Sequence, residues 1–361
     1  MTDLLERIGI SLPIVQAPMA GTSTPALAAA VTEAGGLGSI GVGATNVHGA
    51  REMIESLRSR TDGPFNVNVF CHRPAAARPD VERAWLDALR PVFARFGAEP
   101  PAAIHEIYKS FLADAGTQEL LIALRPKVVS FHFGLPKPDV VARLNAAGIV
   151  LLSTATNLAE AQCAAAAGID AVVAQGFEAG GHRGVFDPDL PDPQLGTLAL
   201  TRLLVERVEL PVIAAGGIMD GAGIAAALKL GAVAAQLGTA FIACPESSAD
   251  AHFRAALFGP GAASTQMTAA VSGRPARSLP NAMTALTQSV LAGVAVPDYP
   301  IAYDANKALA AAAKAKGVGG FGAQWAGQGA PLARALPVKE LVAALVKELV
   351  AALAEEVRSA R

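Results

Sequence analysis

A glycine-rich stretch around His182 is the part of the sequence best suited to chemistry. It reads Gln175-Gly-Phe-Glu-Ala-Gly-Gly-His-Arg-Gly184 and follows an apolar run that is typical of a buried strand. Glycines let a backbone approach a ligand closely, and their exposed N–H groups can hold an anion. Histidine is the side chain whose unperturbed pKa lies nearest to neutral pH. A solvated histidine in a glycine-rich turn would give the same pattern, so this stretch alone leaves both interpretations open.

Two further glycine motifs, Gly216-Gly217 and Gly238-Thr239, follow the last two of the predicted strands. Backbone N–H groups in tight glycine turns bind phosphate well. In β/α barrels a phosphate site is often built from the loops after strands seven and eight. Few charged residues flank these motifs, which favours a phosphate held mainly by backbone, as in a tightly bound cofactor. Glycines that simply pack against a barrel rim are the alternative.

Eight apolar or β-branched runs predict the strands that must position these motifs, and most are followed by a helical pattern. Runs that are apolar on both faces suit a parallel sheet covered by helices. Eight β/α units predict an α/β fold of the (β/α)8 TIM-barrel type, with its active site at the C-terminal ends of the strands. A Rossmann sheet is disfavoured because Gly41-Val-Gly43-Ala-Thr-Asn46 lacks the third glycine of the dinucleotide motif. Gly35, Gly168 and Gly231 stand where helix C-caps are expected. The predicted strands are 14–19, 37–42, 65–70, 128–133, 149–154, 171–175, 212–215 and 232–241, and the predicted helices between them are 25–34, 47–60, 139–147, 158–167, 197–208 and 221–230.

Two long segments do not fit a regular barrel. Residues 71–127 contain amphipathic stretches around 81–96 and 102–112, and residues 245–304 are rich in Pro, Gly and Ser. Long loops on the catalytic face of a barrel are commonly lids or substrate walls. We therefore expect a barrel of residues 1–70 plus 128–244. A smaller, mostly helical substrate-capping region with C-terminal helices would comprise 71–127 plus 245–361, and its last part, 338–357, is predicted to be a packing helix.

Composition excludes several classes of function. The chain has 361 residues, of which 52% are hydrophobic and 17% charged, and a net charge of −2 without a basic stripe. This predicts a globular protein that binds neither nucleic acid nor membrane. No signal peptide or membrane span is visible. Cys71, Cys163 and Cys244 are widely spaced, which favours a cytoplasmic location and disfavours structural zinc. A catalytic metal is not expected either, because only His132, His182 and Glu178 are candidate ligands.

Motifs that carry a family resemblance run from Gln16 to Gly329. They are Gln16-Ala-Pro-Met-Ala-Gly-Thr-Ser-Thr-Pro25, Ala34-Gly-Gly-Leu-Gly38, Phe65-Asn-Val-Asn-Val-Phe-Cys-His-Arg-Pro74, Ser130-Phe-His-Phe-Gly-Leu-Pro136, Gln175 to Gly184, Ala214-Ala-Gly-Gly-Ile-Met-Asp220, Gln236-Leu-Gly-Thr-Ala-Phe241, Asp298-Tyr-Pro-Ile-Ala-Tyr303 and Gln324-Trp-Ala-Gly-Gln-Gly329. With them the chain resembles the class I nitronate monooxygenases, formerly called 2-nitropropane dioxygenases, which are FMN-dependent barrel enzymes.

The resemblance implies roles for individual residues. It places His182 beside the flavin and the substrate as the catalytic residue, with His132, Tyr299, Tyr303 and Lys307 lining the substrate pocket. From the residues alone, the two tyrosines could be buried aromatics, Lys307 a solvated charge and His132 a core histidine. Non-covalent FMN contacts are implied at Pro18, Met19, Asn68, Gln175, Gly180, Gly181, Gly217, Gln236, Leu237, Gly238 and Thr239.

The reaction that the resemblance implies is the oxidation of alkyl nitronates, such as propionate 3-nitronate, by O2. The nitronate gives one electron to FMN, the flavin semiquinone and substrate radical react with O2, and a carbonyl compound with nitrite or nitrate results. A nitronate is already deprotonated, so we expect His182 to act mainly in binding and electrostatics. Detoxification by a monomer or homodimer fits this reading. The alternatives are an FMN-dependent enoyl-thioester reductase using NAD(P)H and a non-enzymatic flavin-binding protein.

Overall fold

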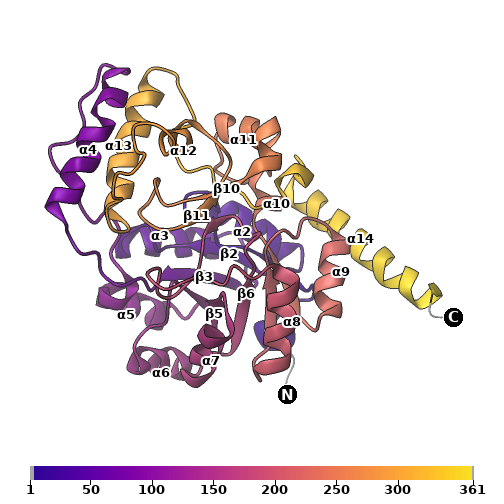
Figure 1. The fold of residues 1–361 in the computed structure, drawn as a ribbon. Coiled ribbons are helices and arrows are strands. Elements are labelled where there is room, and N and C mark those ends of the chain that lie inside the picture. Colours follow the sequence, from indigo (N-terminus) through magenta and orange to yellow (C-terminus); the bar gives the residue numbers. More distant parts are fainter. Residues whose placement is uncertain (1–3, 360–361) are drawn as a thin grey trace.

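Eight parallel strands form a closed barrel at the centre of the molecule (Figure 1). The computed structural model describes residues 4–359, with side chains described through residue 354. Around the barrel the order is β1-β9-β8-β6-β5-β4-β3-β2, and a bridge between Val15 and Leu37 joins the first strand to the second. All eight predicted strands are therefore confirmed. They are β1 (Ile14–Gln16), β2 (Gly38–Gly41), β3 (Phe65–Phe70), β4 (Val128–His132), β5 (Val150–Ala155), β6 (Ala171–Gln175), β8 (Val212–Ala215) and β9 (Ala234–Leu237).

Helices cover the outside of the barrel, and their ends follow from the sequence. Side chains of Asn46, Asn157 and Asp220 each accept a hydrogen bond from a backbone N–H in the first turn of the helix that follows. Gly35, Gly168 and Gly231 adopt φ of 94°, 82° and 98°, which confirms the predicted C-caps. The covering helices are α2 (Pro25–Glu33), α3 (Val47–Arg58), α5 (Ala115–Leu124), α6 (Pro138–Ala146), α7 (Leu158–Ala166), α8 (Thr197–Arg207) and α9 (Gly221–Lys229).

The barrel interior is closed at its N-terminal end by apolar side chains. A short helix that the sequence did not predict, α1 (Leu4–Ile8), contributes Leu4 and Ile8 to a buried cluster with Val128, Leu152 and Ile213 from the strands. Because this end is filled, a ligand can enter only from the opposite end, where the strands finish. Among residues 4–359, no helix is both long enough and apolar enough to cross a membrane.

Two predictions of local structure were wrong. The eighth strand ends at Leu237, not at residue 241, because a short helix, α10 (Thr239–Ile242), begins directly after Gly238. The amphipathic stretch around 102–112 is irregular through residue 110, and a 3-10 turn, η1 (Phe111–Ala113), follows. His182 is not in an irregular loop but in a two-residue strand, β7 (Gly181–His182).

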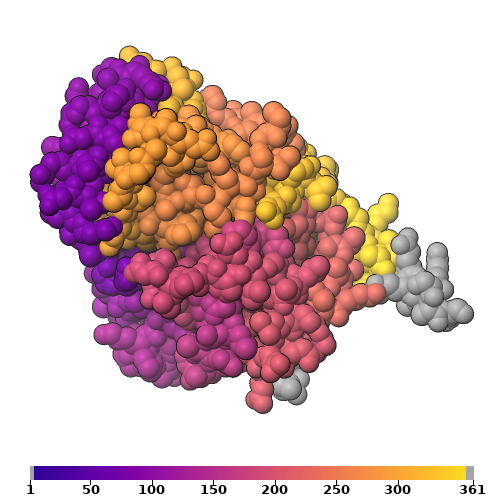
Figure 2. Space-filling view, viewed as in Figure 1, coloured from indigo at the N-terminus to yellow at the C-terminus, as the bar shows by residue number. Residues whose placement is uncertain are grey.

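A cap covers the mouth of the barrel. Its apolar cluster joins Trp85, Leu89 and Phe93 of α4 (Pro79–Ala94) to Ile301 and Leu309 of α13 (Ile301–Ala315). Figure 2 shows α4 and α13 as parts of one continuous surface above the barrel. The other elements of this region are α11 (Ala251–Leu257), η2 (Pro260–Ser264), α12 (Ala282–Leu286), η3 (Ala330–Leu332) and a small sheet in which β11 (Ala276–Ser278) pairs with β10 (Gln266–Thr268) and with β7. Two segments far apart in the sequence thus pack together over the barrel.

The C-terminal helix belongs with the barrel helices in packing. Leu341 and Leu345 of α14 (Val338–Ser359) share a buried cluster with Ile224 of α9 and Leu27 of α2. The Glu348 carboxylate accepts a hydrogen bond from the Gly221 amide and forms an ion pair with Arg334, which lies just before α14. Similarly, α5 packs against the barrel cluster through Leu120 and Leu121. The boundaries between barrel and cap at residues 71, 128 and 245 stay a prediction. That prediction places α5 and α14 in the cap region, and both helices pack against the buried clusters of the barrel.

Candidate active site

A cavity of about 680 Å³ lies where the barrel strands end and the cap begins. Its volume is in the range typical of small-molecule and cofactor sites. Of the residues predicted to form the site, Leu237 does not line it, because its side chain is buried in the cluster between β9 and the outer helices. All the others surround the cavity: Pro18, Met19, Asn68, His132, Gln175, Gly180, Gly181, His182, Gly217, Gln236, Gly238, Thr239, Tyr299, Tyr303 and Lys307.

One end of the cavity is built from backbone. Gly216 and Gly217, at the end of β8, have φ of 127° and 70°, a conformation that favours glycine. Gly238 lies beside them between β9 and the short extra helix α10. The amides of Gly217 and Gly238 donate no hydrogen bond within residues 4–359, so both are available to an anion. This is the place and the construction of the phosphate site found in many barrels.

Glu178 fixes this backbone from behind. Its carboxylate accepts hydrogen bonds from the Thr197 amide (2.8 Å) and hydroxyl (2.9 Å), and the Thr197 hydroxyl lies 3.0 Å from the Gly216 carbonyl oxygen. The Glu178 carbonyl oxygen accepts from the Gln328 amide (2.9 Å). Glu178 therefore ties the glycine turn to both α8 and the segment after Trp325, and it does not face a metal site. Within the described part of the chain, no three His, Cys, Asp or Glu side chains converge as metal ligands.

The backbone of His182 is held by two side chains from the barrel strands. Gln175 Nε2 lies 3.0 Å and His132 Nε2 lies 3.2 Å from the His182 carbonyl oxygen. A carbonyl can only accept, so both nitrogens donate, and His132 Nδ1 then accepts from the Thr154 hydroxyl at 2.9 Å. Gln175 Oε1 also accepts from the Gly184 amide at 2.7 Å. Both ring nitrogens of His132 are thus engaged in positioning His182.

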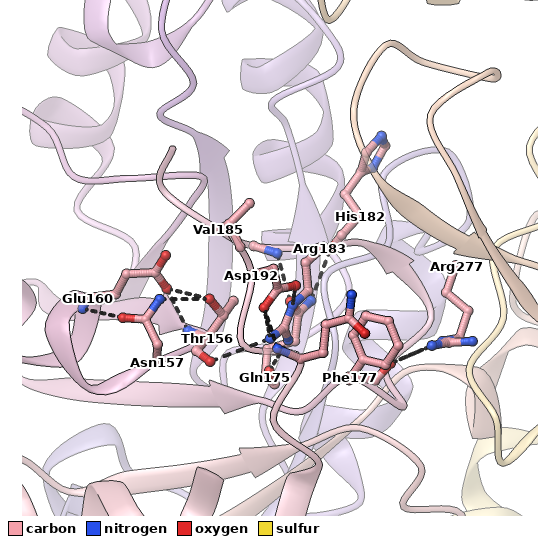
Figure 3. A network of polar contacts seen from close by, with 12 residues as sticks. Thr156, Asn157, Glu160, Gln175, Phe177, His182, Arg183, Val185, Asp192 and Arg277 are labelled. Atoms are coloured by element: carbon pink, nitrogen blue, oxygen red, sulfur yellow. Dashed lines mark hydrogen bonds and ion pairs between the residues drawn. The ribbon is translucent and has the colours of Figure 1, made fainter. Parts of the chain in front are cut away.

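A buried ion pair fixes the side chain of Arg183, the residue that follows His182. Arg183 is buried and donates to Asp192 Oδ2 (2.8 Å) and to the Gln175 carbonyl oxygen. Figure 3 shows Arg183 pointing into this network and His182 pointing away from it. Successive residues of a strand point to opposite sides, so anchoring Arg183 on one side directs His182 toward the other.

The His182 ring lies in an aromatic cage at the cavity wall. Its Nε2 is 2.9 Å from the Ser272 hydroxyl, and the rings of Tyr299, Trp325 and Phe133 are 5.4, 5.1 and 5.5 Å away between centroids. Burial holds the pKa of His182 well below its usual value, and the positive charge of Arg274 and the neighbouring histidines lower it further. Burial likewise lowers the pKa of His132 to about 4. Both rings are therefore neutral at pH 7.

The cap supplies the opposite wall. Lys307 is exposed at the mouth, and its Nζ lies 4.6 Å from the ring centroid of Tyr108 and 5.8 Å from that of Tyr303. Tyr299 is buried, and its hydroxyl has no hydrogen-bond partner within the residues described. Burial raises the pKa values of Tyr299 and Tyr303, so both hydroxyls stay protonated and can donate. This wall offers hydrogen-bond donors and a cation to a ligand with negative charge.

Sequence reasoning missed several residues of this site. Tyr108 lines the cavity from the amphipathic stretch around 102–112, which carried no signal for a site residue. Ser272 and Phe133 surround His182 from a long insert and a strand end. Trp325 was visible only as part of a family motif. Ser272 carried no local signal, because its role depends on the pairing of β7 with β11, which brings residues 90 positions apart into contact.

Comparison with known proteins gives this geometry a family. The profile of the nitronate monooxygenase family matches residues 2–348. The chain belongs to the nitronate monooxygenase family. It is 63% identical to a nitronate monooxygenase of Paraburkholderia phytofirmans, over 95% of this chain and 93% of the relative. It is 58% identical to a nitronate monooxygenase of Pseudomonas aeruginosa, over 96% of this chain and 99% of the relative.

A solved structure agrees with this assignment. The crystal structure of nitroalkane oxidase from Streptomyces ansochromogenes superimposes with a TM-score of 0.88 at 42% identity, covering 98% of this chain and 99% of that chain. The nitronate monooxygenase family is generally flavin-dependent. The resemblance inferred from the motifs and the predicted barrel are both confirmed.

Proposed function

We propose that this protein is an FMN-dependent nitronate monooxygenase that oxidises alkyl nitronates, such as propionate 3-nitronate, with O2 to a carbonyl compound and nitrite or nitrate. One observation carries the proposal beyond family membership. A single cavity joins a backbone site suited to a phosphate, at Gly217 and Gly238, to a wall of neutral donors and a cation suited to an organic anion.

The residues present fit FMN. The phosphate would be held by the amides of Gly217, Gly238 and Thr239, with Gly216 positioned through Glu178. Pro18, Met19, Asn68, Gln175, Gly180, Gly181 and Gln236 would line the rest of the flavin. When bound, FMN supplies the redox chemistry, taking an electron from the nitronate and passing it to O2. The protein's part is to bind, to orient and to exclude water.

The nitronate would be held by hydrogen bonds in the cage. The unpartnered Tyr299 hydroxyl and the neutral His182 ring can both donate to its oxygens, and Lys307 at the mouth attracts the anion. Because the substrate is already an anion, no base is needed and a neutral histidine is adequate. His132 lines the same cavity, but its two ring nitrogens are used to hold the His182 carbonyl and Thr154.

Oxygen consumption tests the proposal. The purified yellow protein is given propionate 3-nitronate in one vessel and NADH in another. Rapid oxygen uptake with nitronate and none with NADH is the expected result, and reversed-phase chromatography of the released flavin should show FMN. Flavin bleaching by NADH with no response to nitronate would move the protein to the enoyl-thioester reductases, and silence in both vessels would favour a flavin-binding protein without this activity.

His182→Asn should lower kcat/KM for the nitronate by about ten- to a hundredfold, the value of one hydrogen bond to a charged group. Asparagine keeps a donor near the same place but loses the contact with Ser272. FMN content, measured by absorbance of the purified variant, should be retained because the phosphate site is unchanged. A variant with FMN and wild-type turnover on nitronate would remove the assigned role of His182.

We also propose detoxification of nitronates as the physiological role, with cytoplasmic residence and a monomeric or homodimeric state. All three cysteines are free, and two of them are buried. Burial raises the pKa of the Cys244 thiol to about 12, so it is unreactive. Size-exclusion chromatography with light scattering would decide the oligomeric state.

A further inference from the structure

Arg274 is a buried cation without a carboxylate partner. The residue is 3% exposed and forms no ion pair among the described residues, and the carboxylates of Glu160 and Asp187 act on its charge only from farther away. It donates to the carbonyl oxygens of Val185 and Phe186, and Nε has no partner among the described residues. Buried charges are ordinarily paired, so an unpaired one needs a physical reason.

The guanidinium lies directly behind the substrate wall. Its carbon Cζ is 4.3 Å from the ring centroid of Phe133, and that same ring is in edge contact with His182 and Tyr299, each at 5.5 Å. The backbone of Arg274 is also part of the site, because its amide donates to the Ser272 hydroxyl (3.3 Å) that contacts His182 Nε2 (2.9 Å). One aromatic ring thus separates a permanent positive charge from the cage.

The charge of Arg274 acts more strongly on a ligand in the cage than the charge of Lys307 at the mouth of the cavity. Lys307 is exposed, so water and salt screen it, whereas Arg274 lies in an environment of low polarity. The field reaches the cage, since Arg274 contributes to the lowered pKa values of His72, His132 and His182. With these histidines neutral, the buried positive charge near the reacting end of the cavity comes from Arg274, which forms no ion pair among the described residues, and from Arg183, which is paired with Asp192.

We propose that Arg274 is an electrostatic positioning residue, which selects the anionic nitronate over neutral molecules of the same shape by placing a positive charge without an ion-pair partner behind Phe133. This inference rests on the proposed function. A bound anion would supply the missing counter-charge at a distance, without touching the guanidinium. A neutral nitroalkane would gain nothing from that charge.

A purely structural role is the competing explanation, and Arg277 offers a matched control. Arg277 is also 3% exposed, lies 4.8 Å from the ring centroid of Phe177 and donates to the carbonyl oxygens of Phe177 and Thr265. It differs in location, because its charge does not contribute to the lowered pKa of the cage histidines. Loss of Arg277 should therefore report the effect of removing a buried arginine as such.

The test compares binding of an anion and a neutral probe to the holoenzyme by isothermal titration calorimetry. Inorganic nitrate serves as the planar anion and 2-nitropropane, freshly dissolved without oxygen, as the neutral probe. Arg274→Met should raise the Kd of nitrate about tenfold and change that of 2-nitropropane less than twofold. Arg277→Met should leave the ratio of the two values unchanged. Equal losses for both probes in Arg274→Met, or unchanged nitrate affinity, would overturn the proposal.

Arg274→Lys keeps the proposal testable if the methionine variant does not fold. Burial lowers the pKa of a lysine more readily than that of an arginine, so this variant should bind nitrate like wild type at pH 7 and lose affinity as the pH rises toward 9. Wild type should not, because burial lowers the pKa of Arg274 only to about 10. Parallel pH profiles for the two proteins would contradict the inference. Wild-type oxygen uptake with nitronate is recorded on the same preparations, so a failure of the proposed function shows as absent uptake and is distinct from unchanged nitrate binding.

Discussion

Acidification from pH 7 to pH 4.5 should destabilise the folded protein by several kcal/mol, with the histidines of the active-site wall as the cause. Burial lowers the pKa of His72 and of His132 to about 4, and that of His182 lies well below its usual value. In the unfolded chain each would have a pKa near 6.5. These rings are neutral in the folded protein, so their stability contribution is complete above pH 6.5 and is lost as the pH falls toward 4.

The size of the effect follows from the difference between the two pKa values. For His72 and His132 the loss is about 2.5 kcal/mol each over this interval. Urea unfolding of the holoenzyme at pH 7, 6, 5 and 4.5 would give the free energy of unfolding and its slope. The slope between pH 6 and pH 5 should correspond to between two and three protons taken up on unfolding.

Substitution of a single histidine shows how much that residue contributes to the pH dependence of the free energy of unfolding. His72 is 1% exposed, and its ring makes edge contact with Tyr299 at 4.9 Å. His72→Gln should remove about one proton from the slope. If the slope of His72→Gln equals that of wild type, the buried histidine is not the source of the acid sensitivity.

The barrel could be predicted from sequence because its signals are local. Each strand is a short apolar run, and four of the covering helices, α2, α6, α7 and α9, are followed by a glycine in the left-handed conformation, as at Gly168. The eighth strand was overextended for the same reason, because Ala240 and Phe241 are as apolar in the short helix α10 as they would be in a strand. Periodicity cannot distinguish a buried strand from a buried helix over four residues.

The site was only partly predictable because its contacts are not local. The glycine motifs and His182 could be found from residue type, and Tyr299, Tyr303 and Lys307 from family motifs. Ser272, Tyr108 and Arg274 could not, because Tyr108 reaches the cavity, and Ser272 and Arg274 reach the residues around it, only through packing between the cap and the barrel. The amphipathic stretch around 102–112 has the same limit, since its backbone is irregular through residue 110 and the His105 amide donates to the Asp304 side chain of α13.

Gly180→Ala should destabilise the protein by about 3 kcal/mol or more and strip it of cofactor. A Cβ at this position would lie 2.5 Å from the carbonyl carbon of Ala326 and still closer to the amide nitrogen of Gly327. Both are backbone atoms, which cannot rotate away as a side chain could. The approach is reciprocal, because a Cβ on Gly327 would lie 2.6 Å from the Glu178 carbonyl oxygen.

The displaced segment matters because it connects both ends of the site. The Gly327 amide donates to the Thr239 hydroxyl (2.9 Å) beside the proposed phosphate turn, and Trp325, two residues earlier, packs on the His182 ring. Pushing this segment away would therefore loosen the phosphate end and the aromatic cage together. Thermal unfolding and the ratio of flavin absorbance to protein absorbance would measure the two losses.

Two other glycines calibrate the result. Gly261→Ala should stay within about 0.5 kcal/mol of wild type, because the nearest atom to the added Cβ is a proline side-chain carbon at 3.5 Å. Gly181→Ala should fall between them, since its φ of 77° strains an alanine but its nearest neighbour is 3.9 Å away. A Gly180→Ala protein with wild-type stability and flavin content would mean that the two backbones do not meet as closely as the structure places them. The backbone at Ala326 and Gly327 would then pack less closely against Gly180 than the contacts around His182 imply.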